Sequence, residues 1–420
     1  MNISTKNEKS ATHSQELALL DQRLSEAGKS VDQIIGQLAG LQIAIPSWAL
    51  GSGGTRFGRF SLGGQPRNLE EKFEDVGLLH QLTQMAGRIS LHIPWDIPED
   101  IEHLKQVATE HQLQFDAMNS NTFQDQPDQD LSYKFGSLSH TDKKVRQQAV
   151  DHNKLVIDYG KKLGSKSLTV WLADGTNHPG QSHLSKALGR TAESLMEIYE
   201  YMPTDWSLFI EYKPFEPYFY STVIPDWGTS FLLATDTGER AYTLVDLGHH
   251  LPNTNIEQIV ATLIARGKLG GFHFNDSKYA DDDITVGSIK PFQLFLIFME
   301  IIQGMWGNTK NPPIAFMIDA SHNLKDPLLD LLESLESIGL AFIKASLIDY
   351  ESLHEAQERN DISHCSAVLQ DAFQTDVRPI LREYRVRYGG AYDPVGWFKD
   401  QKVRDRLIEQ RGQNIKASGL

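Results

Sequence analysis

The sequence is short of cysteine, of basic residues relative to acidic ones, and of long hydrophobic runs. Its one cysteine, Cys365, excludes a disulfide framework within the chain and suits a reducing compartment. The 40 Lys and Arg residues are outnumbered by 55 Asp and Glu residues, for a net charge of -15. This charge argues against a nucleic acid as the main partner, because a phosphate backbone is bound by clustered basic side chains. A neutral small molecule fits it better.

No run of about 18 apolar residues is present, which excludes a transmembrane helix. The polar start of the chain lacks the apolar core of a signal peptide, so we expect a cytoplasmic protein with no membrane partner. No Pro/Ser-rich linker divides the chain. We therefore predict one barrel domain over residues 41–338, an N-terminal extension over 1–40 with a helix at 13–38, and a C-terminal helical extension over 339–420. Both extensions are natural oligomer contacts.

Eight short runs of β-branched or apolar residues recur along the chain, beginning near residues 41, 88, 113, 167, 207, 242, 270 and 314. Segments with helical periodicity lie between them. Strands that alternate with helices predict right-handed crossovers and a parallel sheet, and eight such units close a (β/α)₈ TIM barrel. An open doubly wound sheet is the structural alternative.

Capping signals place three of the intervening helices. Thr141 is a candidate N-cap for a helix that ends at Gly164. Thr254 is followed three residues later by a glutamate, the spacing of a capping box. Asn68 and Glu71 repeat this spacing.

Polar side chains close the late strands of the predicted barrel, at the end where parallel barrels carry their functional sites. Strand residues two apart share a face, so a glutamate and a lysine at the end of the fifth strand lie together. Asp246 is followed by His249 and His250, and the motif GGFHFNDSKYADDD places a histidine inside an apolar run before a loop of aspartates. The candidate residues are Glu211, Lys213, Asp246, His249, His273, Asp281, Asp283, Asp319 and Ser321.

Carboxylates crowded at one end of a barrel would be costly to bury unpaired, and a divalent cation removes the conflict. Oxygen ligands with one or two imidazoles favour Mn²⁺, Mg²⁺ or Co²⁺ over a structural zinc, which prefers cysteine. An isolated DDD is usually a solvated loop and an isolated buried histidine usually a core residue, but four consecutive strands supply ligands here. One ion would bind Glu211, Asp246, His273 and Asp319, and a second would bind His249, Asp281 and Asp283.

Nine segments spread over about residues 45–326 resemble L-rhamnose isomerases, in particular their broad-specificity bacterial branch. They are IPSWALGSGGTRFGRF, SLHIPWD, FDAMNSNTF, YKFGSLSHT, LTVWLADG, FYSTVIPDWGT, LVDLGHHLPNTNIE, GGFHFNDSKYADDD and MIDASHN. The resemblance implies a xylose-isomerase-like barrel, a homotetramer and two divalent cations per subunit, usually Mn²⁺. It also implies an intramolecular oxidoreductase that interconverts L-rhamnose and L-rhamnulose and accepts rarer sugars such as D-allose, L-lyxose and L-mannose.

The resemblance assigns a role to each matched residue. It implies that the first group of ligands binds a structural metal and the second group a catalytic one, and that Lys213 holds O1 of the open-chain sugar. The catalytic residues would be Lys213, Asp319, Ser321 and His249, and the sugar-binding residues His92, Trp95, Trp48, Trp171 and Phe57, the last reaching into a neighbouring subunit. Tyr212 stands where the family often has histidine, and we expect little effect because its side chain alternates away from the metal face.

The mechanism and two rival functions stay open at this level. Transfer between C1 and C2 would proceed by a metal-assisted hydride shift, or through an enediol with a carboxylate or a water moving the proton. A metal-dependent phosphodiesterase or endonuclease would need a basic face, against which the net charge counts. A non-catalytic, metal-assembled sugar-binding protein would bind metal and sugar without turnover.

Overall fold

The computed structural model describes residues 10–26, 28–51, 62–127, 129–215, 220–320 and 324–413. Its main sheet contains ten parallel strand segments, which correspond to eight barrel strands because two of the strands are interrupted once. The segments are β1 (Ala44–Pro46), β2 (Arg88–Ser90), β3 (His92–Ile93), β4 (Gln114–Phe115), β5 (Met118–Ser120), β6 (Ser167–Val170), β8 (Ser207–Glu211), β10 (Ala241–Asp246), β11 (Leu269–Phe274) and β12 (Ala315–Ile318).

The strand pairings run around a complete ring. Strand β12 pairs with β1, and β1 pairs with β2. The β2/β3 strand pairs along its length with the β4/β5 strand, which continues through β6, β8, β10 and β11 back to β12. The ring confirms the predicted TIM barrel and excludes the open doubly wound sheet.

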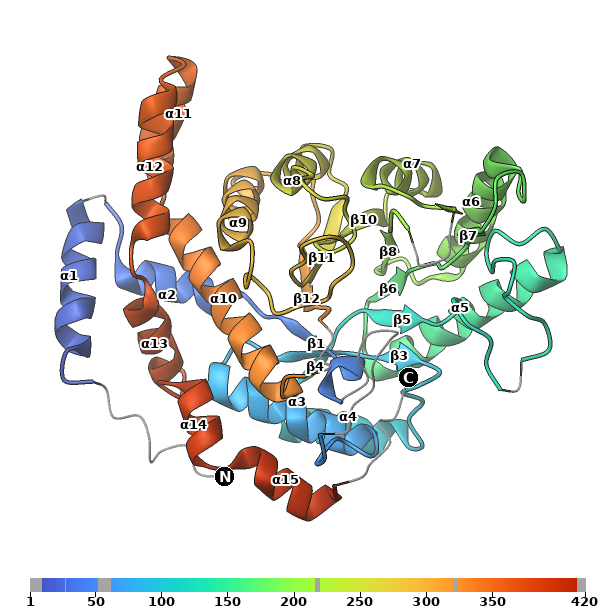
Figure 1. Cartoon of the computed structure of the whole chain (residues 1–420), viewed down its shortest axis with the longest axis horizontal. Helices are drawn as coiled ribbons and strands as arrows, with labels where there is room; N and C mark the ends of the chain where they lie inside the picture. Colours follow the sequence, from blue (N-terminus) through green and yellow to red (C-terminus); the bar gives the residue numbers. More distant parts are fainter. Residues whose placement is uncertain are drawn as a thin grey trace.

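One helix follows each barrel strand and packs outside it (Figure 1). These are α3 (Leu69–Thr83), α4 (Ile101–Glu110), α5 (Lys143–Leu163), α6 (Leu184–Tyr201), α7 (Trp227–Thr237), α8 (Ile256–Ala265), α9 (Pro291–Met305) and α10 (Pro327–Leu347). The eighth barrel helix therefore ends at Leu347, and the predicted domain boundary at residue 338 cuts through it.

The helix caps correct two of the three sequence predictions. Asn68 caps α3 as predicted, accepting a hydrogen bond from the backbone of Glu71. The cap of α5 is Asp142 rather than Thr141, and that of α8 is Asn255 rather than Thr254. Each error is one residue, because neighbouring polar residues compete for the cap and the backbone direction decides between them.

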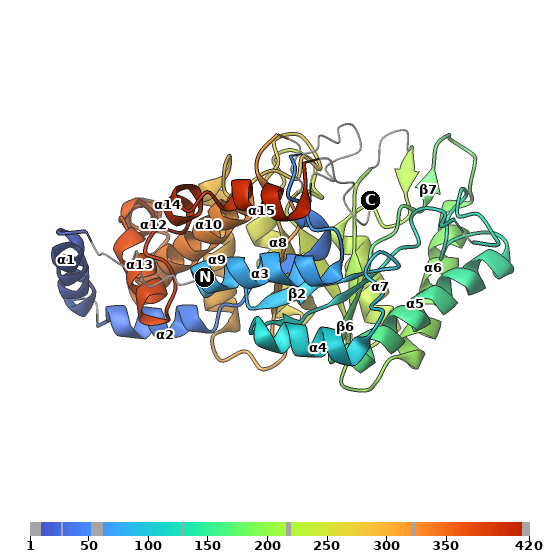
Figure 2. The same cartoon turned by 90° about the horizontal axis from the view of Figure 1, so that it is seen from below.

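The N-terminal helices pack against helices of the C-terminal region beside the barrel (Figure 2). The predicted leading helix is two helices, α1 (His13–Glu26) and α2 (Val31–Ala39), and both contact α13 (Arg378–Arg387). A buried contact of 2.9 Å joins His13 Nε2 on α1 to Glu383 Oε2 on α13. The remaining elements of this region are α11 (Tyr350–Glu358), α12 (Ile362–Gln374), α14 (Pro394–Asp400) and α15 (Val403–Arg411). No helix in the described ranges has the length and apolar character needed to cross a bilayer.

A small apolar cluster inside the ring forms the floor of the site. Ala117, Phe209 and Leu244 make up this cluster, which is separate from the main core between strands and helices. Phe209 and Leu244 lie two residues before Glu211 and Asp246 and share their face of the sheet. Gly270 leaves room for this floor, because a Cβ there would lie 2.6 Å from the ring of Phe209. The barrel is therefore packed below the candidate ligands, which stand above an apolar base.

Candidate active site

Four predicted ligands from consecutive strands meet above this floor. Glu211 and Asp246 are the last residues of β8 and β10, His273 lies near the end of β11, and Asp319 directly follows β12. One ligand atom from each lies within 4.8 Å of the others. In the sheet, Asp246 and His273 are direct neighbours in register. The group could hold a metal ion.

His273 is the electrostatic centre of this group. Its Nδ1 lies 3.1 Å from Glu211 Oε1, 3.4 Å from Asp319 Oδ2 and 3.7 Å from Asp246 Oδ2. Burial opposes protonation, but the surrounding carboxylates outweigh it and raise the pKa of His273 to about 9. Burial raises the pKa of Asp319 to about 7, despite the nearby His273. For Glu211, the positive charges of His273 and His249 overcome burial and hold the pKa at about 2.

The donor set fits a divalent cation. Three carboxylates and one imidazole are the ligand types that Mn²⁺, Mg²⁺ and Co²⁺ accept. Asp246 Oδ2 is buried and has no hydrogen-bond donor among the described residues, which is costly for an ionised oxygen unless a cation serves it. In the metal-free protein, protons on the histidines partly balance this charge.

The second predicted group lies beside the first. His249 Nδ1 is 3.2 Å from Glu211 Oε1, and its Nε2 is 3.2 Å from Asp281 Oδ1. Burial together with the carboxylates of Asp281 and Asp319 raises the pKa of Asp283 well above its ordinary value. Its carboxyl also hydrogen-bonds Asp281. The structure thus places all three predicted residues next to the first group, in a looser arrangement than the four ligands of that group.

The loop between β11 and α9 separates the roles of its three consecutive aspartates. Asp282 accepts hydrogen bonds from the backbone nitrogens of Lys278 and Tyr279, at 2.6 and 2.9 Å, and so closes its own turn. Asp281 instead accepts from Lys213 Nζ at 2.6 Å. Asp283 has a φ of 50°, a left-handed backbone that is uncommon for a residue other than glycine. Two of the aspartates are directed inward and the middle one outward.

An aromatic wall lies beside the candidate metal ligands. The ring centre of His92 lies 4.1 Å from that of Trp95 in a stacked pair and 5.3 Å from that of Trp48 in an edge-to-face pair. Phe123 contacts His92 and Trp171, and the sequence analysis did not single it out. Burial lowers the pKa of His92 to about 3, so this imidazole is neutral and offers one donor and one acceptor. Such a wall suits a neutral ligand with apolar C–H faces.

Two contacts connect the wall to the charged groups. Trp48 Nε1 donates to Asp319 Oδ1 at 2.9 Å. Lys213 Nζ lies 5.1 Å from the centre of the Trp171 ring, within the range of a cation–π interaction. Trp48 therefore orients a candidate metal ligand as well as lining the pocket.

A buried carboxylate that the sequence analysis missed supports this wall. Asp96 Oδ1 accepts from Lys72 Nζ at 2.7 Å, and its Oδ2 accepts from the backbone of His92 at 2.8 Å and from the hydroxyl of Ser47. Ser47 immediately precedes Trp48, so one carboxylate ties together the chain segments that carry Trp48, His92 and Trp95. Its role depends on contacts distant in sequence, and no local pattern marks it.

Two predicted site residues cannot be placed. Phe57 falls within residues 52–61 and Ser321 within 321–323, both outside the described residues.

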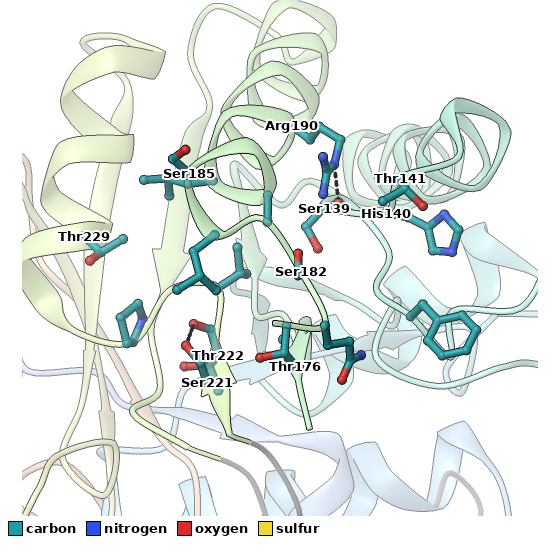
Figure 3. A pocket seen from close by; sticks show the side chains of 18 residues that line it. Ser139, His140, Thr141, Thr176, Ser182, Ser185, Arg190, Ser221, Thr222 and Thr229 are labelled. Carbon is teal, nitrogen blue, oxygen red and sulfur yellow. Dashed lines mark hydrogen bonds between the residues drawn. The ribbon is translucent and has the colours of Figure 1, made fainter. Parts of the chain in front are cut away.

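A separate cavity of about 540 Å³ lies between α6 and a two-stranded ribbon, β7 (Gly175–Thr176) and β9 (Ser221–Thr222). Figure 3 shows its hydroxyl-rich wall, with Ser182, Thr176 and Thr222 around it. None of the candidate metal ligands lines this cavity.

Comparison with known proteins gives the family. Residues 81–301 match the family described as xylose isomerase-like TIM barrel. A protein named as a probable sugar isomerase from Rhizobium meliloti (strain 1021) is 48% identical over 392 residues, 93% of this chain and 91% of that protein. Another with that description, from Mesorhizobium japonicum, is 48% identical over 402 residues, 96% of this chain and 93% of that protein.

Solved structures share the fold at low sequence identity. An L-ribulose 3-epimerase has a TM-score of 0.52 at 17% identity, covering 76% of this chain and 97% of its own. A 3-keto-D-glucoside 4-epimerase from E. coli has a TM-score of 0.51 at 14% identity, covering 71% and 98%. The ring of strands, the matched family and the two relatives agree: this chain belongs to the xylose isomerase-like TIM-barrel family.

Proposed function

We propose that this protein is a metal-dependent aldose–ketose isomerase that interconverts L-rhamnose and L-rhamnulose and accepts related rare sugars. The observation that carries the proposal is the meeting of Glu211, Asp246, His273 and Asp319 at one end of the barrel, with Lys213 close by. The names of the two close relatives as probable sugar isomerases support the reaction class. The preference for L-rhamnose rests on the sequence motifs.

The proposed cofactor is two divalent cations per subunit, with Mn²⁺ preferred and Co²⁺ or Mg²⁺ as substitutes. Glu211, Asp246, His273 and Asp319 would hold one ion, and His249, Asp281 and Asp283 the other. When bound, the ions would polarise the sugar oxygens and stabilise negative charge on them. The number and identity of the ions are testable by elemental analysis of the purified protein.

The protein's own side chains would orient the open-chain sugar. Lys213 is held by Asp281 and sits against Trp171, so its ammonium is a fixed positive charge for O1. The neutral imidazole of His92 can donate to one sugar hydroxyl or accept from it, and the rings of Trp48 and Trp95 cover apolar C–H faces. These groups fix the sugar and exclude water from the reacting carbons.

Conversion of the aldose to the ketose moves one hydrogen from C2 to C1 and one proton from O2 to O1. In a hydride shift the C2 hydrogen travels with its electron pair and never meets solvent. In an enediol route a base, either Asp319 or a water near it, would remove this hydrogen as a proton and deliver a proton to C1. Turnover in D₂O separates the routes: retained substrate hydrogen supports the shift, and rapid incorporation of deuterium supports the enediol.

The first test of the function is sugar conversion by chelator-stripped protein before and after addition of Mn²⁺. We expect turnover of L-rhamnose to return with the metal, and a panel of L-lyxose, L-mannose and D-allose to rank the other substrates. L-rhamnulose should be assayed as well, with products identified by NMR, because conversion of this ketose into a ketose with inverted C3 would replace isomerisation with epimerisation. Metal binding without conversion of any sugar would contradict the proposal.

The aspartate loop offers a matched set of variants. Asp281→Asn and Asp283→Asn should each lower activity by at least about tenfold at limiting Mn²⁺, because each removes a charged ligand from the second ion. Asp282→Asn, in the same loop, should retain activity, because an amide oxygen can still accept the two turn-closing hydrogen bonds. Equal losses in all three variants would point to loop folding and not to metal binding.

The homotetramer implied by the sequence motifs is also a proposal, which light scattering at several protein concentrations would check.

A further inference from the structure

A buried hydrogen bond joins the two chain segments that carry the second-ion ligand His249 and the strand end Glu211–Lys213. The hydroxyl of Tyr212 and Nε2 of His250 are 2.7 Å apart, and their rings meet edge to face at 5.4 Å. Tyr212 is 1% exposed and His250 8% exposed. The pair is therefore enclosed by protein and shielded from competing water.

The direction of this hydrogen bond follows from its surroundings. His250 Nδ1 lies 3.4 Å from the carbonyl oxygen of Leu247, to which it can donate only weakly. That tautomer leaves Nε2 as an acceptor for the Tyr212 hydroxyl. Burial lowers the pKa of His250 to about 3 and raises that of Tyr212 well above its ordinary value, so both groups are neutral.

The Tyr212–His250 hydrogen bond lies beside a contact at the candidate metal site that is made by the preceding residue of each segment. Tyr212 follows Glu211 in the chain, and His250 follows His249. On the inner side, His249 Nδ1 lies 3.2 Å from Glu211 Oε1, and on the other side Tyr212 contacts His250. The same two backbone segments are thus joined twice, once on each face. The outer bond restrains the backbone that aims the His249 ring at Asp281, from which it is 3.2 Å distant.

We propose that the Tyr212–His250 pair is a positioning device for His249, which sets the affinity of the second ion without touching ion or sugar. This inference rests on the proposed function for its catalytic consequence, but its first consequence is metal affinity. It also assigns the two adjacent histidines: His249 faces the site and His250 supports it from behind. The earlier expectation that Tyr212 has little effect on the chemistry is revised accordingly.

The test measures Mn²⁺ binding to chelator-stripped protein by the EPR signal of free Mn²⁺, with no sugar present. Tyr212→Phe removes one hydroxyl and keeps the ring. We expect it to weaken one class of Mn²⁺ sites about tenfold, the size typical for loss of an outer partner of a metal ligand, and to leave the other class within about twofold. His250→Gln keeps the Tyr212 hydroxyl and can still place an acceptor opposite it, so this variant should retain most of the affinity.

A matched control is Tyr384→Phe. Tyr384 is likewise buried and donates its hydroxyl at 2.8 Å to the carbonyl of Gln84, in the terminal helical region. We expect this variant to bind Mn²⁺ like the unsubstituted protein, even if its melting temperature falls. In activity assays Tyr212→Phe should need about tenfold more Mn²⁺ for half-maximal turnover, with kcat largely recovered at saturating metal and the sugar KM little changed.

Unchanged Mn²⁺ affinity in Tyr212→Phe would overturn the inference, as would an equal loss in Tyr384→Phe. Failure of the proposed function gives a different result. If the unsubstituted protein binds Mn²⁺ but converts no sugar, the positioning of His249 is still measured by the binding experiment. If it binds no Mn²⁺, both proposals fail.

Discussion

Protons and metal ions compete for the same buried group, so metal affinity should depend steeply on pH. The pKa of His273 is about 9 and that of Asp319 about 7 in the metal-free protein. An ion can bind only to the deprotonated forms of these ligands. Lowering the pH from 8 to 6 is therefore expected to weaken binding, because protons then compete more strongly with the ion for both residues.

The magnitude follows from the two pKa values. At pH 6, protonation of His273 reduces the apparent affinity by about three powers of ten and protonation of Asp319 by about one; at pH 8 the penalties are about one and about zero. The difference is about 1,000-fold, or about 4 kcal/mol. Nearly two protons should leave on binding at pH 6, and about one at pH 8.

Isothermal titration calorimetry with Mn²⁺ measures both quantities. Titrations at pH 6, 7 and 8 give the affinity, and repeating each in two buffers of different ionisation enthalpy gives the number of protons released. An affinity that changes less than tenfold between pH 6 and 8, with less than one proton released at pH 6, would refute the assignment of this group as a metal site with charge-balancing protons.

Three other outcomes can be measured by unfolding. The melting temperature of chelator-stripped protein should fall as the pH rises from 6.5 to 9, because the raised pKa of His273 contributes stability that is present below pH 6.5 and is lost as the pH rises through about 9. The increase in melting temperature on adding Mn²⁺ should grow over the same interval. A melting temperature that does not change with pH would contradict the raised pKa of His273. Asp96→Asn should lower the free energy of unfolding in denaturant by about 3 kcal/mol, because Lys72 is then buried without its countercharge. Adding Lys72→Met to this variant should recover part of the loss. If the double variant instead loses the sum of the two single losses, the two residues are not coupled. Gly270→Ala should cost about 1–3 kcal/mol by overpacking the barrel floor, whereas Gly36→Ala, with open space around the position, should not destabilise; equal effects would contradict the packing argument.

Short-range patterns in the sequence determined the barrel and the strand ends. Eight apolar runs separated by helical segments predicted the closed ring, because a parallel strand needs a crossover helix before the next one. The alternation of side chains along a strand put Glu211 on the same face as Lys213, and the common direction of the strands put Asp246, His273 and Asp319 at the same end. These inferences needed only the local period of each strand and one topological rule.

The tertiary structure decided everything that depends on loop direction or on contacts between distant segments. Sequence alone does not tell why Asp282 turns outward between two inward aspartates, since the hydrogen bonds to its turn fix that choice. The different orientations of His249 and His250 likewise depend on Tyr212, which contacts His250 from 38 residues away in the sequence. Aspartates usually lie on the protein surface, so the sequence gives no sign that Asp96 is buried. It supports the aromatic wall only because Lys72 and Ser47 both donate hydrogen bonds to it. Local periodicity sets which face of an element a side chain occupies, whereas the partner it meets there is set by the packing of the whole chain.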